Sequence, residues 1–280
     1  SATPAPSDAA ASPAPSTTPN ANNPPPIKRT QVNKDAKTGV TVTRTWNTDG
    51  GYSLVRTDSA GATVYTYVLS ARSPLTPPPA LDILGNAWPA TATRFFTRTA
   101  TSTWSNGNTS SQVIVVAHDA KGKELERDLT ENVIRGKDKK TQTVMRVETN
   151  FAPWVRTRMD HAMTVQELIK PTFNGATYAM NGTFSVASGD WTKTATLTQA
   201  DGTVQNLTIV DRWRGAVDKT ITQGKRITDL HFNANHAGTG SIKSTDGVLF
   251  AKLVWNTHGK GTMVFLDPNG KRLGSKQINL

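Results

Sequence analysis

The sequence has 280 residues and no cysteine, which excludes disulfides, thiolate metal sites and cysteine nucleophiles. Free thiols are a liability in an oxidising compartment, so their complete absence favours export. No apolar run approaches the roughly 18–20 residues of a transmembrane helix, and we therefore expect no membrane span.

The chain starts at Ser1 rather than Met. We expect an exported bacterial protein whose signal peptide has been removed. Its expected location is the periplasm, the outer-membrane surface or the cell surface. A lipid-modified cysteine upstream of Ser1 is an open alternative.

Acidic and aromatic residues are also few, with 21 Asp and Glu against 32 Lys and Arg, and aromatics at only 7% of the chain. The net charge of +11 would attract nucleic acid, an anionic polysaccharide or acidic lipid headgroups. The basic residues are scattered, however, and no zinc-finger, helix-turn-helix or RNA-recognition motif accompanies them. We therefore expect no specific nucleic-acid recognition, and we favour an anionic cell-wall polymer or an envelope protein complex as the partner.

Residues 1–26 contain only Ala, Pro, Ser, Thr, Asn and one Asp. Such a segment has no side chain whose burial would offset the entropy lost on ordering. Pro-rich chains of this kind are extended and semi-rigid. We expect residues 1–30 to be a Pro/Ala/Ser-rich tether that is disordered or held by a partner.

From Val40 onward, short runs rich in β-branched and aromatic residues alternate with turns built on Gly and Asp, Asn or Ser. Examples are GVTVTRTW and YSLVRT, which TDGG separates. These runs favour strands, and the turn residues accept the positive φ of tight hairpins. About fourteen to sixteen strands are expected, and neighbours in sequence usually pair. The sequence predicts an all-β fold: a long antiparallel meander that forms a large sandwich, a half-barrel or a small barrel.

The segment DHAMTVQELIKP, residues 160–171, carries the best helix signals. Thr164 and Glu167 have the spacing of a capping box, and Pro171 would end the helix. We expect one short helix here, packed against the sheet. We expect the tether to be followed by two hairpin-rich halves, residues 31–160 and 161–280, and the helix to open the second half. The alternative is one continuous domain over residues 31–280.

Any metal would depend on His, Asp and Glu, and three histidines come close enough in sequence to be considered: His231, His236 and His258. Imidazoles from neighbouring loops could hold copper or zinc. Copper-dependent superoxide dismutases also use histidines on a β-sandwich, but their His-x-His pair is absent here. The likeness is therefore one of fold, which is no argument for function.

Tryptophan is common for so polar a chain, with seven Trp against four Tyr. Arg alternates with aromatic residues in TRTW, TRFFTRT, APWVRTRMD and DRWRG, which permits cation–π packing along a sheet face. Trp and Arg are also the residues enriched at interface anchors. The candidate partner-binding residues are Trp46, Trp104, Trp213, Arg212 and Arg214.

These observations favour a non-enzymatic accessory protein of the cell envelope or surface layer that docks on a larger assembly or on a cell-wall polymer. Such a protein needs no cofactor. The first alternative is an exported metalloenzyme with a copper or zinc site at the three histidines and antioxidant activity. The second is a periplasmic carrier of apolar ligands, which would have a deep apolar cavity beneath residues 160–171.

Overall fold

The computed structural model describes residues 26–152 and 161–280. In these two ranges every regular element is a β-strand, so the predicted all-β class is confirmed. Most of the expected tether lies outside the described residues, but residues 27–30 belong to the first strand. No helix in the described ranges has the length and hydrophobicity that crossing a membrane requires.

Nineteen strands form one sheet, and each longer strand pairs antiparallel with its neighbours in sequence. The strands are β1 (Ile27–Lys34), β2 (Thr41–Asn47), β3 (Tyr52–Thr57), β4 (Thr63–Leu69), β5 (Ser73–Pro74), β6 (Arg94–Trp104), β7 (Thr109–His118), β8 (Glu124–Arg135), β9 (Lys140–Ala152), β10 (His161–Ile169), β11 (Thr177–Phe184), β12 (Trp191–Thr198), β13 (Val204–Asp211), β14 (Val217–Gln223), β15 (Arg226–Phe232), β16 (Gly238–Ser244), β17 (Leu249–Trp255), β18 (Lys260–Leu266) and β19 (Arg272–Asn279).

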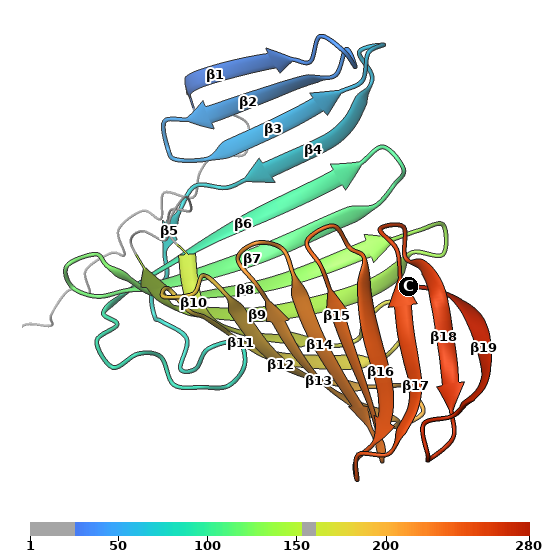
Figure 1. The fold of residues 1–280 in the computed structure, drawn as a ribbon. Helices are drawn as coiled ribbons and strands as arrows, with labels where there is room; N and C mark the ends of the chain where they lie inside the picture. The colour runs from blue at the N-terminus through green and yellow to red at the C-terminus, as the bar shows by residue number, and fades with distance from the viewer. Residues whose placement is uncertain (1–25, 153–160) are drawn as a thin grey trace, which may run out of the picture.

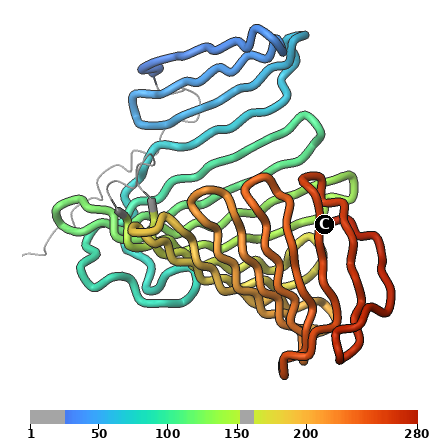
Figure 2. The backbone as a smooth tube through the Cα atoms, viewed as in Figure 1, coloured from blue at the N-terminus to red at the C-terminus, as the bar shows by residue number. Residues whose placement is uncertain are grey.

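The sheet is a single open layer that curves along its length (Figures 1 and 2). No ladder joins β1 to β19 among the described residues, so these strands are its two edges. The β9–β10 ladder crosses the boundary expected near residue 160 and joins the two halves. The predicted meander is confirmed, and β1, β14 and β15 are strands that the sequence patterns do not reveal.

One turn geometry recurs between the strands. In each case the first residue accepts a hydrogen bond from the fourth residue and donates one to the fifth, as in the turn that starts at Asp58. The fourth residue has positive φ, and it is usually Gly, as Gly61 shows with φ of 86°. This is a type I turn followed by a residue in the left-handed region, a standard way to close a hairpin. The Gly-marked reversals in the sequence are therefore what order the meander.

The predicted helix at residues 160–171 is wrong, because this segment forms β10 between β9 and β11. The two residues of the expected capping box instead make cross-strand contacts. Asn150 Nδ2 donates to Thr164 Oγ1 at 2.9 Å, and Glu167 pairs with Arg146. The capping-box spacing is a local signal, and tertiary context overrides such signals when strands on both sides offer ladders.

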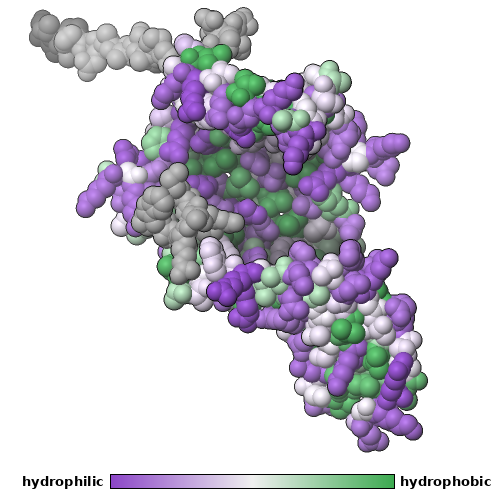
Figure 3. Space-filling model, turned by 45° about the horizontal axis from the view of Figure 1, so that its top comes forward, coloured by the Kyte–Doolittle hydropathy of each residue, from purple (hydrophilic) through white to green (hydrophobic). Residues whose placement is uncertain are grey.

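Pairing and alternation place Trp46, Trp104, Trp191 and Trp255 on the same side of the sheet, which we call the inner face. The inner face also carries the hydrophobic cluster of β15–β19, which consists of Ile242, Ala251, Leu253 and Trp255 with Leu230, Phe232, Met263 and Ile278 packed against it. A single layer can bury such side chains only where it curls towards them. Figure 3 shows a hollow in the upper part of the view, with apolar side chains on its floor and hydrophilic ones around its rim.

A long loop, residues 70–93, lies against the other side of the sheet, which we call the outer face (Figure 1). It is held by the hydrogen bond from Ile83 N to Asp128 Oδ2, 2.9 Å long. Trp88 of this loop contacts Phe95 edge-on, with ring centroids 5.1 Å apart. The loop therefore provides a second layer over a small part of the sheet.

Candidate functional site: an arginine and aromatic surface

Arginines and aromatic residues share the inner face of β1–β6. Alternation places arginines of four strands on this side: Arg29 on β1, Arg44 on β2, Arg56 on β3 and Arg98 on β6, with Arg94 farther away at the start of β6. The same register places five aromatic side chains beside them, Trp46, Tyr52, Tyr65, Tyr67 and Trp104, while Phe96 lies with Arg94 near the start of β6. We call these nine residues, without Arg94 and Phe96, the Arg–aromatic surface.

The strands that build this surface contain no acidic residue. Strands β1 to β7 hold seven Lys and Arg but no Asp or Glu. None of the four arginines has an ion pair with a carboxylate in the described part of the chain. The charge of the surface is therefore not neutralised by the strands that carry it, and it would attract an anion.

The aromatic rings contact one another and fix the surface. Arg29 lies over the ring of Trp46, with Cζ 5.1 Å from the centroid. The Trp46 and Tyr52 centroids are 5.5 Å apart, and those of Tyr52 and Tyr67 are 6.1 Å apart. Tilted rings at these separations attract one another beyond simple burial. The surface is therefore preorganised and would lose little side-chain entropy on binding a ligand.

Arg98 is partly buried in this surface. Desolvation lowers the pKa of its guanidinium, and repulsion from Arg72 lowers it further, while the nearby Tyr67 acts in the opposite direction. Its Nε is buried and has no hydrogen-bond partner in the described structure. A bound anion would supply the acceptor that this group lacks.

A shallow cavity of about 580 Å³ opens at one end of the surface. Arg56, Tyr65 and Trp104 line it, together with Val40, Val64 and Asp58. The Tyr65 and Trp104 ring centroids are 5.1 Å apart. The Asp58 carboxylate accepts hydrogen bonds from Ala60 N and Ala62 N, both 2.9 Å long, so it is used within its own turn.

A second cavity, of about 500 Å³, lies on the inner face between β8 and β13. Val165, Met180 and Ile209 contribute apolar surface, but charged side chains line it as well. Among them are Arg127, Arg146, Glu148 and Glu167, which form ion pairs across β8, β9 and β10. The deep apolar cavity expected beneath a helix at residues 160–171 is therefore replaced by a cavity with a mixed lining on β10.

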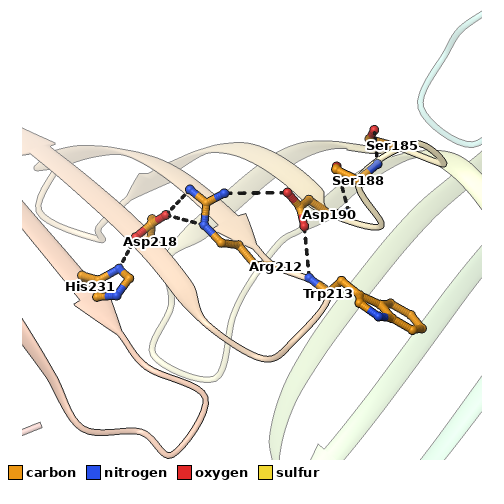
Figure 4. Close-up of polar contacts among 7 residues, drawn as sticks. All are labelled: Ser185, Ser188, Asp190, Arg212, Trp213, Asp218 and His231. Carbon is orange, nitrogen blue, oxygen red and sulfur yellow. Dashed lines mark hydrogen bonds and ion pairs between the residues drawn. The ribbon is translucent and has the colours of Figure 1, made fainter.

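The remaining candidate partner residues lie away from the Arg–aromatic surface, in the turn after β13 (Figure 4). Arg212 pairs with Asp218 at 2.6 Å and with Asp190 at 3.8 Å. The backbone N–H of Trp213 donates to Asp190 at 3.0 Å, and Arg214 is exposed in the same turn. The five candidates therefore divide between two places, because β2 and β6 lie far from β13 in the strand order. The segment APWVRTRMD falls mainly on residues outside the described ranges.

The three candidate metal ligands have separate roles. His231 contacts Asp218 on the outer face, and this hydrogen bond is the largest cause of the lowered pKa of Asp218. His236 occupies the positive-φ position of the turn before β16. His258 lies in the turn after β17, beside Thr257. Within the described ranges, no three His, Asp or Glu side chains are grouped as a metal site would require.

Sequence reasoning missed a pair of buried carboxylates on the outer face of β8. Glu126 is 4% exposed and Asp128 is 1% exposed beneath the residue 70–93 loop. Burial raises the pKa of each carboxyl to about 7; repulsion from Asp128 adds to the effect on Glu126, and the Asp82 carboxylate adds to both. The only signal is their spacing of two residues in a strand, which places both on one face.

No known family model matches this chain. The curated proteins likewise contain no significant match.

Proposed function

We propose that this chain is a non-enzymatic binding module of the bacterial cell envelope that attaches to an anionic polymer through the Arg–aromatic surface. The observation that carries the proposal is the unneutralised group of four arginines on one face of strands that contain no acid. Arg presents a planar fork that binds carboxylate or phosphate in a bidentate manner. The aromatic rings add contact area at little entropic cost.

The Arg–aromatic surface is better suited to attachment than to catalysis. It offers cations and flat rings for binding, but its strands contain no carboxylate that could act as a general base. An extended face also suits a polymer, because several weak contacts along one chain add together. This supports an accessory role in which the chain attaches to an anionic polymer.

The test is a tryptophan-fluorescence titration with poly(glycerol phosphate) and with heparin. We expect binding that weakens steeply with salt, because cations released from the polymer drive it. The triple variant Arg29→Ser, Arg44→Ser, Arg56→Ser should bind at least tenfold more weakly. The control replaces three exposed turn lysines, Lys121, Lys137 and Lys225, by Ser.

The control removes the same charge from other parts of the molecule, so it should keep affinity within about threefold of the parent. Equal loss in both variants would show that net charge alone attracts the polymer. No binding of either polymer at low salt would contradict the proposal itself. Melting curves for both variants would show whether each remains folded.

A further inference from the structure

Two parallel diagonals run across the Arg–aromatic surface. Arg29 is paired with Trp46, two residues from Arg44, and Arg44 is paired with Leu54, two residues from Arg56. Each step in the series Arg29, Arg44, Arg56 therefore moves to the next strand and two residues along the strand direction. Diagonal neighbours of this kind are about 7–8 Å apart.

The aromatic diagonal takes the same step. Tyr52 is paired with Leu69, two residues from Tyr67, and Tyr67 is paired with Ser102, two residues from Trp104. The series Tyr52, Tyr67, Trp104 thus advances in the same direction as the arginines, displaced across the sheet. A linear ligand along this direction would meet a cation on one side and a ring on the other at each repeat.

We infer that the Arg–aromatic surface binds single-stranded nucleic acid without sequence preference, with phosphates on the arginine diagonal and bases on the aromatic diagonal. The inference rests on the proposed function, since it names the anionic polymer. A single nucleic-acid strand carries one phosphate and one flat ring per repeat, and its extended repeat is comparable to the diagonal step. Proteins that bind single strands generally combine a cationic track with aromatic rings on which bases stack.

The cavity beside Trp104 gives one base a place to insert. Its volume of about 580 Å³ lies between Trp104, Tyr65 and Arg56. A base stacked on Trp104 would leave its phosphate within reach of Arg56, the last arginine of the diagonal. The half-buried rings are held by each other, so the site is formed before the strand arrives.

Other polyanions match only one of the two diagonals. A ring-free polyphosphate would use the arginines and leave the aromatic side chains without a partner. A duplex keeps its bases stacked inside, so their faces cannot reach the rings. Stacking accepts every base, which accounts for recognition without sequence preference and without a motif that reads base edges.

The experiment compares oligonucleotides by fluorescence anisotropy at fixed ionic strength. The probes are a labelled oligo(dT), an abasic oligomer of equal length and a duplex, with unlabelled polyphosphate as competitor. We expect oligo(dT) to bind at least tenfold more tightly than the abasic oligomer, because the phosphates are equal and only the rings differ. The salt dependence of binding to oligo(dT) should be steep.

Variants separate the two diagonals. Trp104→Leu should weaken oligo(dT) binding about tenfold and leave abasic binding unchanged. Arg56→Ser should weaken both and reduce the logarithmic salt slope by about 0.7. The matched control is Trp213→Leu, because the Trp213 side chain is 50% exposed and lies in a distant turn. This variant should leave the binding of both oligo(dT) and the abasic oligomer unchanged.

The outcomes distinguish this inference from the proposed function. Equal binding of oligo(dT), abasic oligomer and polyphosphate would overturn the nucleic-acid inference and leave polyanion attachment standing. Tighter binding of duplex, or of heparin, would overturn it in the same way. Failure of every polyanion to bind would overturn both.

Discussion

At the residue scale, His236 shows how strictly the recurring turn constrains its fourth position. This position is occupied by Gly in the other turns of the same hydrogen-bond pattern, but here His236 has φ of 69°. A side chain in this left-handed region is strained, since its Cβ approaches the following carbonyl oxygen. The contact from Trp255 Nε1 uses the carbonyl oxygen of His236, not its imidazole.

We therefore predict that His236→Gly raises the free energy of unfolding by about 0.5–1 kcal/mol, since relief of strain outweighs the added chain entropy. The backbone contact to Trp255 is retained. The matched control is Gly202→Ala, where φ is +84° and an added Cβ meets no neighbour within 4 Å. It should lower stability by about 1 kcal/mol. Urea denaturation measures both, and a less stable His236→Gly variant would show that the imidazole has a structural role.

At the element scale, the residue 70–93 loop and β8 enclose carboxyl groups that ordinarily face water. Asp128 Oδ2 accepts the Ile83 N–H, while Asp128 Oδ1 and Glu126 Oε1 have no hydrogen-bond partner in the described structure. Burial disfavours the charged form, so the pKa of each carboxyl is raised to about 7 from 3.8 for Asp128 and 4.5 for Glu126. The folded protein therefore binds more protons than the unfolded chain between about pH 4 and 7.

The sign of the pH dependence follows. The contribution of these groups to stability is complete below about pH 4 and is lost as pH rises through about 7. We predict that Glu126→Gln and Asp128→Asn flatten this loss and stabilise the protein at pH 8 by roughly 1–3 kcal/mol. Asn keeps an oxygen acceptor for Ile83 N–H.

Urea denaturation at pH 5 and pH 8 checks the global effect, and hydrogen exchange at the Ile83 amide checks the loop. Asp201→Asn, in an exposed turn where backbone hydrogen bonds lower the pKa of the carboxyl, is the control. It should leave the decline in the free energy of unfolding with rising pH unchanged. Variants as pH-sensitive as the parent would show that the two carboxyls are ionised in the folded protein.

At the scale of the whole molecule, the single open layer has two edges, β1 and β19, each of which pairs on one side only among the described strands. β1 carries Lys28, Arg29 and Lys34, β19 carries Arg272 and Lys276, and neither strand has an acidic residue. Edge strands with unpaired backbone groups invite pairing between copies, and like charges oppose it. The like charge of the two edges would therefore oppose pairing of β1 of one copy with β19 of another.

We predict that Arg272→Glu with Lys276→Glu produces concentration-dependent self-association, because β19 then attracts the basic β1 edge. Sedimentation velocity at low salt measures the association, which high salt should reverse. The control, Lys121→Glu with Lys137→Glu, makes the same charge change in exposed turns and should not self-associate. If both variants associate equally, reduced net charge is the cause, and the edges have no special role.

The candidate site could be predicted only in part. The alternation of Arg and aromatic residues in TRTW and TRFFTRT places Arg44, Trp46 and Arg98 on one side of their strands. Arg29 and Arg56 join them through register alone, since β1 is missing from the expected strands and a shift of one residue would move each to the other face. Arginines also flank Trp213, but Trp213 lies in the turn between β13 and β14, outside the strands that form the Arg–aromatic surface.

The sequence by itself determined the all-β class and the order of the meander, because each hairpin is encoded locally by β-branched runs and by a residue that accepts positive φ. The tertiary structure alone decided that residues 161–169 are a strand, because pairing with β9 on one side and β11 on the other overrides the local helix signals. It also decided which distant arginines share a face and which carboxyls are buried. These properties depend on pairing register and on the path of a loop, which are set by contacts between segments far apart in the chain.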